Sequence, residues 1–127
     1  MTHDPAASDT PAASDLVALR DAMRAFVAER DWAQFHSPKN LAMALSVEAA
    51  ELVEHFQWLT EQQSRSLDAA ARAPIAEELA DVLLYLVRIA DELDVDLHAA
   101  ARAKLVRNAE KYPVHKARGS ARKYTEY

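Results

Sequence analysis

The sequence predicts an all-α protein, and three features carry this prediction. Apolar residues recur at the 3.6-residue period of helices through most of the chain. The β-branched and aromatic residues follow the same period, with almost none of the two-residue alternation that strands show. The segments between the predicted helices are short, which favours an antiparallel four-helix bundle. At 127 residues, the chain has the size of one domain.

The first half of the chain predicts two helices. Residues 1–14 are dominated by Ala, Ser, Asp, Thr and Pro without periodicity, so we expect a disordered leader there. Apolar residues at helical spacing then predict a first helix from residue 15 to about residue 30. Ser37 followed by Pro38 is typical of a helix start, so the second helix is expected from residue 38 to about residue 59.

The second half predicts two further helices. The third is expected to begin near Pro74, after a polar connection whose alanine-rich part is itself compatible with a helix. The fourth is expected over about residues 96–111, because Pro113 cannot continue it. We therefore assign residues 15–112 to one helical domain and residues 113–127 to a basic, irregular C-terminal tail.

The composition excludes several kinds of site. The chain contains no cysteine, so disulfides, thiolate metal sites and cysteine nucleophiles are excluded. Its single glycine, Gly119, cannot build a phosphate-binding loop, which needs several glycines to bring backbone N–H groups to the ligand. Cations would therefore have to bind any phosphate, and a metal ion would have oxygen or imidazole ligands.

Charge and hydropathy indicate the location and the partners. The net charge of -5 argues against a nucleic-acid partner. No uncharged apolar run approaches the roughly 18 residues of a membrane-spanning helix. The N-terminus has neither the basic nor the apolar region of a secretory signal. We therefore expect a soluble, cytoplasmic protein with no membrane partner.

Two pairs of acidic residues stand out on the predicted helices. On a helical wheel, Glu48 falls at the centre of the apolar stripe of the second helix, and Glu51 lies at its edge. Glu78 and Asp81, again three residues apart, flank the apolar stripe of the third helix. Because a buried carboxylate without compensation is costly, a positive charge is expected beside them.

Two interpretations of these carboxylates remain open. In one, Glu48 forms an ion pair with Arg88 or Arg107, and the other acids are ordinary surface charges. In the other, all four carboxylates converge on Mg²⁺, which prefers oxygen ligands and for which Mn²⁺ is a possible substitute. Carboxylate-held Mg²⁺ commonly serves phosphate chemistry, because the ion binds phosphate oxygens and activates water for attack on phosphorus.

Aromatic and basic residues supply candidate contacts for a nucleotide. Aromatic side chains near a metal site could stack on a nucleobase, although filling of a core or an interface is the commoner role of each. The candidates are Trp32, Phe35, His36, Trp58 and Tyr85. Three residues of the predicted fourth helix share one face and could contact phosphate oxygens, or simply form a solvated basic face: Lys104, Asn108 and Lys111.

These motifs together resemble one family. The pairs Glu48-x-x-Glu51 and Glu78-x-x-Asp81 occur with FVAERDWAQFHSPKNL, FQW, EELADVLLYLV, a Lys-x-x-x-Asn pair in the fourth helix, and KYP. In this combination the sequence resembles the MazG-like all-α nucleotide pyrophosphohydrolases, specifically the dCTP pyrophosphatase branch. The resemblance extends from about residue 16 to residue 124.

The resemblance implies a dimer or a dimer of dimers, with sites formed where subunits meet. It implies an Mg²⁺-dependent cleavage of a nucleoside triphosphate between its α and β phosphates, with the four acids as metal ligands and as the catalytic set. Lys104 and Asn108 match a pair assigned to the phosphates, and Met23 replaces a histidine of the animal members near the pocket. The residues matching the base and sugar pocket are Trp32, Gln34, Phe35, His36, Trp58 and Tyr85.

The expected function is therefore nucleotide house-cleaning, with dCTP or modified cytosine deoxynucleotides as the expected substrates. In this mechanism Glu51 is the favoured proton acceptor, although the sequence does not single it out. The same chemistry on dUTP or another non-canonical triphosphate is one alternative, because Met23 puts the base preference in question. The other alternative is a non-catalytic helical interaction module.

Overall fold

The computed structural model describes residues 15–127, and it contains helices, turns and irregular segments with no strand in that range. The all-α prediction is therefore confirmed for the described residues. The predicted leader, residues 1–14, lies outside them. The described chain divides into two compact units, one that ends at Asp94 and one that spans Val95–Tyr127, and each is described by itself.

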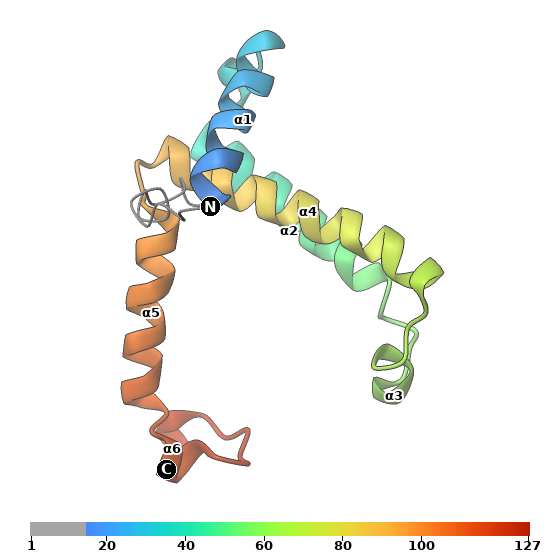
Figure 1. The fold of residues 1–127 in the computed structure, drawn as a ribbon, viewed down its shortest axis with the longest axis vertical. Helices are drawn as coiled ribbons and strands as arrows, with labels where there is room; N and C mark the ends of the chain where they lie inside the picture. Colours follow the sequence, from blue (N-terminus) through green and yellow to red (C-terminus); the bar gives the residue numbers. More distant parts are fainter. Residues whose placement is uncertain (1–14) are drawn as a thin grey trace, which may run out of the picture. The chain divides into compact units, whose positions relative to one another are not determined.

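The first unit is built around an antiparallel pair of helices, α2 and α4, and the shorter α1 packs against α4 (Figure 1). A short helical turn precedes α2, and a small helix, α3, lies in the connection to α4. The elements are α1 (Asp15–Glu29), the 3₁₀ turn η2 (Ala33–Phe35), α2 (Pro38–Glu54), α3 (Glu61–Ser64) and α4 (Ala69–Glu92).

Helix α2 begins where the sequence predicts and ends earlier. The Ser37 hydroxyl accepts a hydrogen bond from the Asn40 N–H at 3.1 Å, and Pro38 occupies the first turn. The helix ends at Glu54 instead of continuing to about residue 59. The backbone then forms turns in which most N–H groups donate to the C=O three residues earlier. Trp58 consequently leaves the face of α2, and 87% of its surface is exposed.

Helix α4 begins earlier than the predicted start near Pro74. The Asp68 carboxylate accepts a hydrogen bond from the Ala71 N–H at 2.8 Å and caps a helix that starts at Ala69. The alanine-rich segment is thus helical, because alanine favours helix formation and the cap satisfies an end group. Pro74 lies within the helix and removes one hydrogen-bond donor, that to the Ala70 C=O.

The buried core of the first unit is small. Its buried apolar side chains come from α1, α2 and α4, and they are Val27, Leu41, Ile75, Val87 and Ala90. Larger apolar side chains stay exposed along α2 and α4, among them Met43, Val47, Val53, Leu79, Leu83 and Leu86. The helix pair therefore presents apolar surface that this unit does not cover by itself.

The second unit consists of α5 (Leu97–Lys111) and a C-terminal segment. The Asp96 carboxylate caps α5 by accepting from the Ala99 N–H at 2.9 Å, and the bounds of the helix agree with the prediction. The tail, predicted to be irregular, contains a short helix, α6 (Val114–Ala117), and a 3₁₀ turn, η3 (Tyr124–Glu126). Tyrosine rings join the tail to the end of α5, since the Tyr112 ring lies 5.8 Å from that of Tyr124.

The assignment of residues 15–112 to one domain, with four helices in a bundle, stays a prediction. Among the described helices, none combines the length and the apolar character that crossing a bilayer requires.

Candidate functional site

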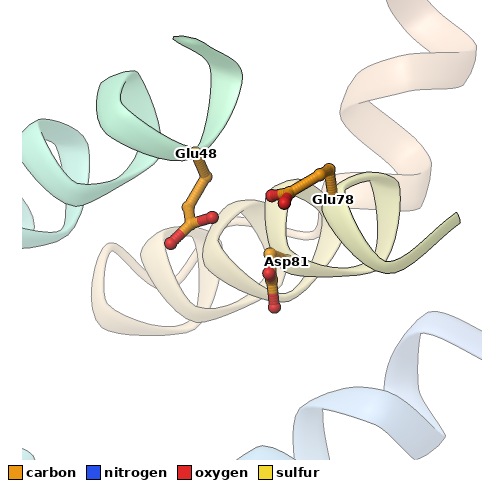
Figure 2. A group of neighbouring side chains, drawn as sticks. All are labelled: Glu48, Glu78 and Asp81. Atoms are coloured by element: carbon orange, nitrogen blue, oxygen red, sulfur yellow. The ribbon is translucent and has the colours of Figure 1, made fainter. Parts of the chain in front are cut away.

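Three of the four predicted acidic residues come together between α2 and α4. Glu48 and Glu78 each offer one carboxylate oxygen, as does Asp81, and these three oxygens all lie within 4.8 Å of one another (Figure 2). Glu78 and Asp81 share one side of α4 because they are three residues apart. Helix α2 packs antiparallel to α4 (Figure 1), and Glu48 on α2 lies beside Glu78 and Asp81 (Figure 2). We call Glu48, Glu78 and Asp81 the acidic cluster.

Glu51 lies next to the acidic cluster without belonging to the group of three oxygens. One turn from Glu48 on α2, it is half-buried. Hydrogen bonding with Glu51 contributes to the raised pKa values of both Glu48 and Glu78, so the Glu51 carboxylate faces both. The structure therefore brings all four predicted carboxylates into one neighbourhood, with Glu51 at its margin.

The electrostatics of the acidic cluster are those of crowded like charges. A hydrogen bond with Glu51, burial, and the charges of Glu51, Asp81 and Glu78 raise the pKa of Glu48 to about 7. Burial raises the pKa of Glu78, as do the hydrogen bond with Glu51 and the charges of Glu51 and Asp81, while His55 opposes this rise. The neighbouring carboxylates thus make the ionised forms of Glu48 and Glu78 less stable.

No Lys or Arg of the described first unit neutralises the cluster. Arg88, one of the two predicted partners of Glu48, binds Glu92 at 2.6 Å and Asp91 at 3.5 Å instead. Among the described residues, His55 is a basic side chain within ion-pairing distance of the cluster, because its Nε2 lies 3.8 Å from Glu78 Oε1. The predicted ion pair between Glu48 and Arg88 is therefore wrong, because Arg88 pairs with other acidic residues of α4.

The acidic cluster has the chemistry that a hard cation requires. In the described part of the chain, the buried oxygens Glu48 Oε2 and Glu78 Oε2 have no hydrogen-bond partner. Buried polar atoms are normally paired, so these two oxygens are candidate ligand atoms for a cation. A set made only of carboxylate oxygens fits Mg²⁺ or Mn²⁺ better than softer metals. These residues could hold a metal ion.

A pocket of about 420 Å³ adjoins the acidic cluster. Asp81 belongs to both, so a ligand in the pocket could extend to the carboxylates. The rest of the lining is apolar or aromatic and comes from α1, from the segment around η2, and from α4. The lining residues are Leu19, Ala22, Met23, Phe26, Val27, Trp32, His36, Asp81, Leu84 and Tyr85.

Half of the predicted base-binding residues line this pocket. Trp32, His36 and Tyr85 do so, and the Trp32 ring lies 5.7 Å from the Phe26 ring in an edge-to-face arrangement. Such aromatic walls can receive a flat ring.

The other predicted base-binding residues lie outside the lining. The Gln34 amide donates to the Asp31 C=O at 3.0 Å. Phe35 is 59% exposed, and Trp58 is still more exposed. Their contact with a ligand stays a prediction.

The contribution of α1 to the pocket was not found from the sequence. Its apolar stripe indicated only a core-facing surface, and Met23 alone was connected with a pocket, through the family resemblance. The periodicity of α1 could not distinguish a face packed on a neighbour from a face that walls a cavity, because both need apolar side chains at the same spacing. Phe26, 42% exposed, illustrates the second kind of position.

The predicted phosphate-binding residues belong to the second unit. Lys104, Asn108 and Lys111 follow one another along α5 at the spacing of one helical face. The Lys111 ammonium lies 5.0 Å from the centre of the Tyr124 ring, so it also supports the folded tail. Their contact with phosphate stays a prediction.

The four acidic residues lie in the part of the chain that matches a known protein family. A model of the MazG-like family matches residues 43–127, a range that includes Glu48, Glu51, Glu78 and Asp81. The chain is 50% identical to dCTP pyrophosphatase 1 of Mus musculus over 103 residues, which cover 80% of this chain and 61% of that protein. The identity and coverage are the same for dCTP pyrophosphatase 1 of Homo sapiens.

The chain therefore spans less than two thirds of the length of these curated relatives. Among solved structures, it is similar to a pyrophosphatase from Archaeoglobus fulgidus, with a TM-score of 0.72 and 32% sequence identity. That similarity covers 89% of this chain and 97% of the archaeal chain, so it extends over nearly the whole fold.

Proposed function

Because this chain belongs to the MazG-like family, we propose that it is an Mg²⁺-dependent nucleoside triphosphate pyrophosphohydrolase. The reaction is cleavage between the α and β phosphates, which yields the nucleoside monophosphate and pyrophosphate. One observation carries the proposal: a carboxylate cluster with unpartnered buried oxygens shares Asp81 with an aromatic-lined pocket. The named relatives, dCTP pyrophosphatase 1 and an archaeal pyrophosphatase, support the same chemistry.

The acidic residues are proposed to hold Mg²⁺, with Mn²⁺ as a possible substitute. Glu48, Glu78 and Asp81 supply converging oxygens, and Glu51 is near enough to complete the set. Bound there, the ion would neutralise the triphosphate and make water a better nucleophile. The carboxylates come from two helices, and Glu51, at the margin of the cluster, is proposed to accept a proton from the attacking water.

The pocket is proposed to bind the base and sugar of the substrate, with dCTP or a modified cytosine deoxynucleotide favoured. Trp32 and Tyr85 supply aromatic faces for stacking, and Asp81 connects the pocket to the metal site. Met23 lines the pocket where animal members are expected to have a histidine, so dUTP or another non-canonical triphosphate is the alternative substrate. Lys104, Asn108 and Lys111 are proposed to contact phosphate oxygens, as their basic helical face suggests. Four further residues are proposed to contact the substrate: Gln34, Phe35, His36 and Trp58.

We further propose that the chain assembles as a dimer or a dimer of dimers with four-helix packing. The exposed apolar residues along α2 and α4 support this, because monomers rarely leave such faces uncovered. Trp58, 87% exposed, and Phe35 would then contact substrate or a neighbouring subunit. We also propose a cytoplasmic location for the chain.

The test is release of pyrophosphate from a panel of triphosphates with and without Mg²⁺. We expect metal-dependent turnover that is fastest with dCTP. Replacing Glu48 or Asp81 with alanine should lower kcat by about a hundredfold or more, since each carboxylate binds the ion that stabilises the reacting phosphates. The matched control is Glu54→Ala, an exposed glutamate of the same helix, which should retain activity.

The outcomes separate the remaining alternatives. Turnover with a preference for dUTP would keep the chemistry and change the substrate. If the protein hydrolysed no triphosphate, the proposed enzymatic activity would be overturned, and a non-catalytic helical module would be favoured. Full activity in the Glu48 and Asp81 variants would remove the acidic cluster from the reaction.

A further inference from the structure

His36 is held by a hydrogen bond that defines which of its nitrogens carries the proton. Arg88 Nε lies 3.2 Å from His36 Nδ1 and donates to it across 52 positions of sequence. A guanidinium has only donors, so Nδ1 must offer its lone pair. The imidazole is therefore neutral, with its proton on Nε2. Burial and the Arg88 charge also lower the pKa of His36, while Glu92 opposes them.

Arg88 is itself fixed in place. Only 6% of its surface is exposed, which makes it the buried charged residue of the first unit's described core. Its remaining donors contact Glu92 at 2.6 Å and Asp91 at 3.5 Å. Asp91 in turn accepts from Arg24 Nε of α1 at 2.8 Å. A buried charge with this many partners has little freedom to move.

This network connects the walls of the pocket. Arg24 comes from α1 and Arg88 from α4, and these two helices supply most of the lining. His36 lines the same pocket from the segment after η2. The network therefore orients the imidazole relative to both helices.

The second nitrogen of His36 is available to a ligand. Nε2 has no hydrogen-bond partner among the described residues. The fully buried side-chain atoms without a partner do not include it. It therefore has accessible surface. Among the residues that line the pocket, His36 is the one that carries an imidazole.

We propose that Arg88 is a positioning residue that holds His36 with its Nε2–H available to a hydrogen-bond acceptor on the nucleobase. The ligand class is a base with a ring carbonyl or an unprotonated ring nitrogen, as in a pyrimidine. The inference deepens the proposed function and rests on it for the identity of the ligand. The arrangement of Arg88 and His36 can be measured without any enzymatic activity.

The first experiment measures the proton on His36 in the wild-type protein without nucleotide or metal. Long-range ¹H–¹⁵N NMR spectra distinguish the two tautomers and the charged ring, and the spectrum of His36→Gln assigns the signals. We expect Nε2 to be protonated and Nδ1 to be a hydrogen-bond acceptor. A proton on Nδ1, alone or together with one on Nε2, overturns the proposal.

The second experiment compares Arg88→Met with Arg72→Met. Arg72 is exposed on the same helix, so its variant controls for loss of charge and for the new methionine. In Arg88→Met the Nδ1 signal should shift toward that of a nitrogen without a hydrogen bond. KM for dCTP should rise about fivefold, because that is the loss of affinity expected when one neutral hydrogen bond is lost. The value of kcat should change less than about twofold. Unchanged Nδ1 signal and unchanged KM overturn the proposal.

Variants of His36 keep the inference testable if Arg88→Met does not fold. His36→Gln retains an N–H near the position of Nε2, whereas His36→Ala retains none. KM should rise about tenfold in His36→Ala and less than about threefold in His36→Gln. Equal losses in both variants overturn the proposed donor. If the wild-type protein hydrolyses no triphosphate, the proposed function fails, while the NMR result still decides whether Arg88 positions His36.

Discussion

Replacing Glu48 with glutamine should stabilise the metal-free protein and weaken its binding of Mg²⁺. The two effects have one cause. The hydrogen bond with Glu51, burial and the neighbouring like charges make the ionised form of Glu48 unfavourable in the folded chain, and the same charges attract a divalent cation. A glutamine has nearly the same shape and no charge, so it removes both the repulsion and the attraction.

The magnitude follows from the pKa of Glu48, which rises from 4.5 to about 7. A pKa raised in the folded state gives stability that is present below pH 4.5 and is lost as the pH rises through about 7. The shift corresponds to at most about 3 kcal/mol. Because Glu48 is partly exposed, solvent screening reduces the expected gain for Glu48→Gln to about 1 kcal/mol above pH 7.

The assay is urea unfolding in a metal chelator, followed by circular dichroism on both sides of this pH window. The matched control is Glu54→Gln, an exposed position of the same helix, which should leave the stability nearly unchanged. Calorimetric titration with Mg²⁺ should show an affinity at least about tenfold weaker for Glu48→Gln. A less stable Glu48→Gln protein at high pH would contradict this prediction, because it would mean that a cation of the chain already pairs with Glu48.

Three further predictions concern the pocket and the helices that carry the site. Trp32→Ala should lower kcat/KM for dCTP about tenfold or more through lost stacking on the base, and pyrophosphate release measures this. Asp68→Ala should lower the free energy of unfolding by about 1 kcal/mol, because it removes the cap of α4, and unchanged stability in urea would contradict the capping role. Leu41→Ala should cost about 3 kcal/mol in the same urea assay, since Leu41 is 2% exposed and its truncation leaves a cavity.

Much of the local structure could be predicted because its causes are local. Ser37 and Pro38 determine the start of α2, and Asp96 determines that of α5, through contacts within a few residues. The end of α2 was missed, since no capping residue precedes Thr60 and the aromatic segment before it follows helical spacing. The start of α4 was placed too late because Pro74 is tolerated inside the helix.

The candidate site divides in the same way. The spacing of Glu48 and Glu51, and of Glu78 and Asp81, indicated two acidic helix faces from the sequence. Whether Arg88 would neutralise Glu48 could not be predicted, because several acids compete for one guanidinium and only their positions in space decide among them. In the structure, Arg88 contacts Asp91, Glu92 and His36.

The helical class, the exclusion of thiolate and glycine-loop chemistry, and the two pairs of acids could all be predicted without coordinates, because composition and periodicity are properties of the chain alone. Three contacts are seen only in the folded protein: Glu48 meets Glu78 and Asp81, α1 lines the neighbouring pocket, and Arg88 binds His36. These contacts join residues far apart in sequence. Their formation depends on which helix faces pack together, and helical periodicity does not specify that choice.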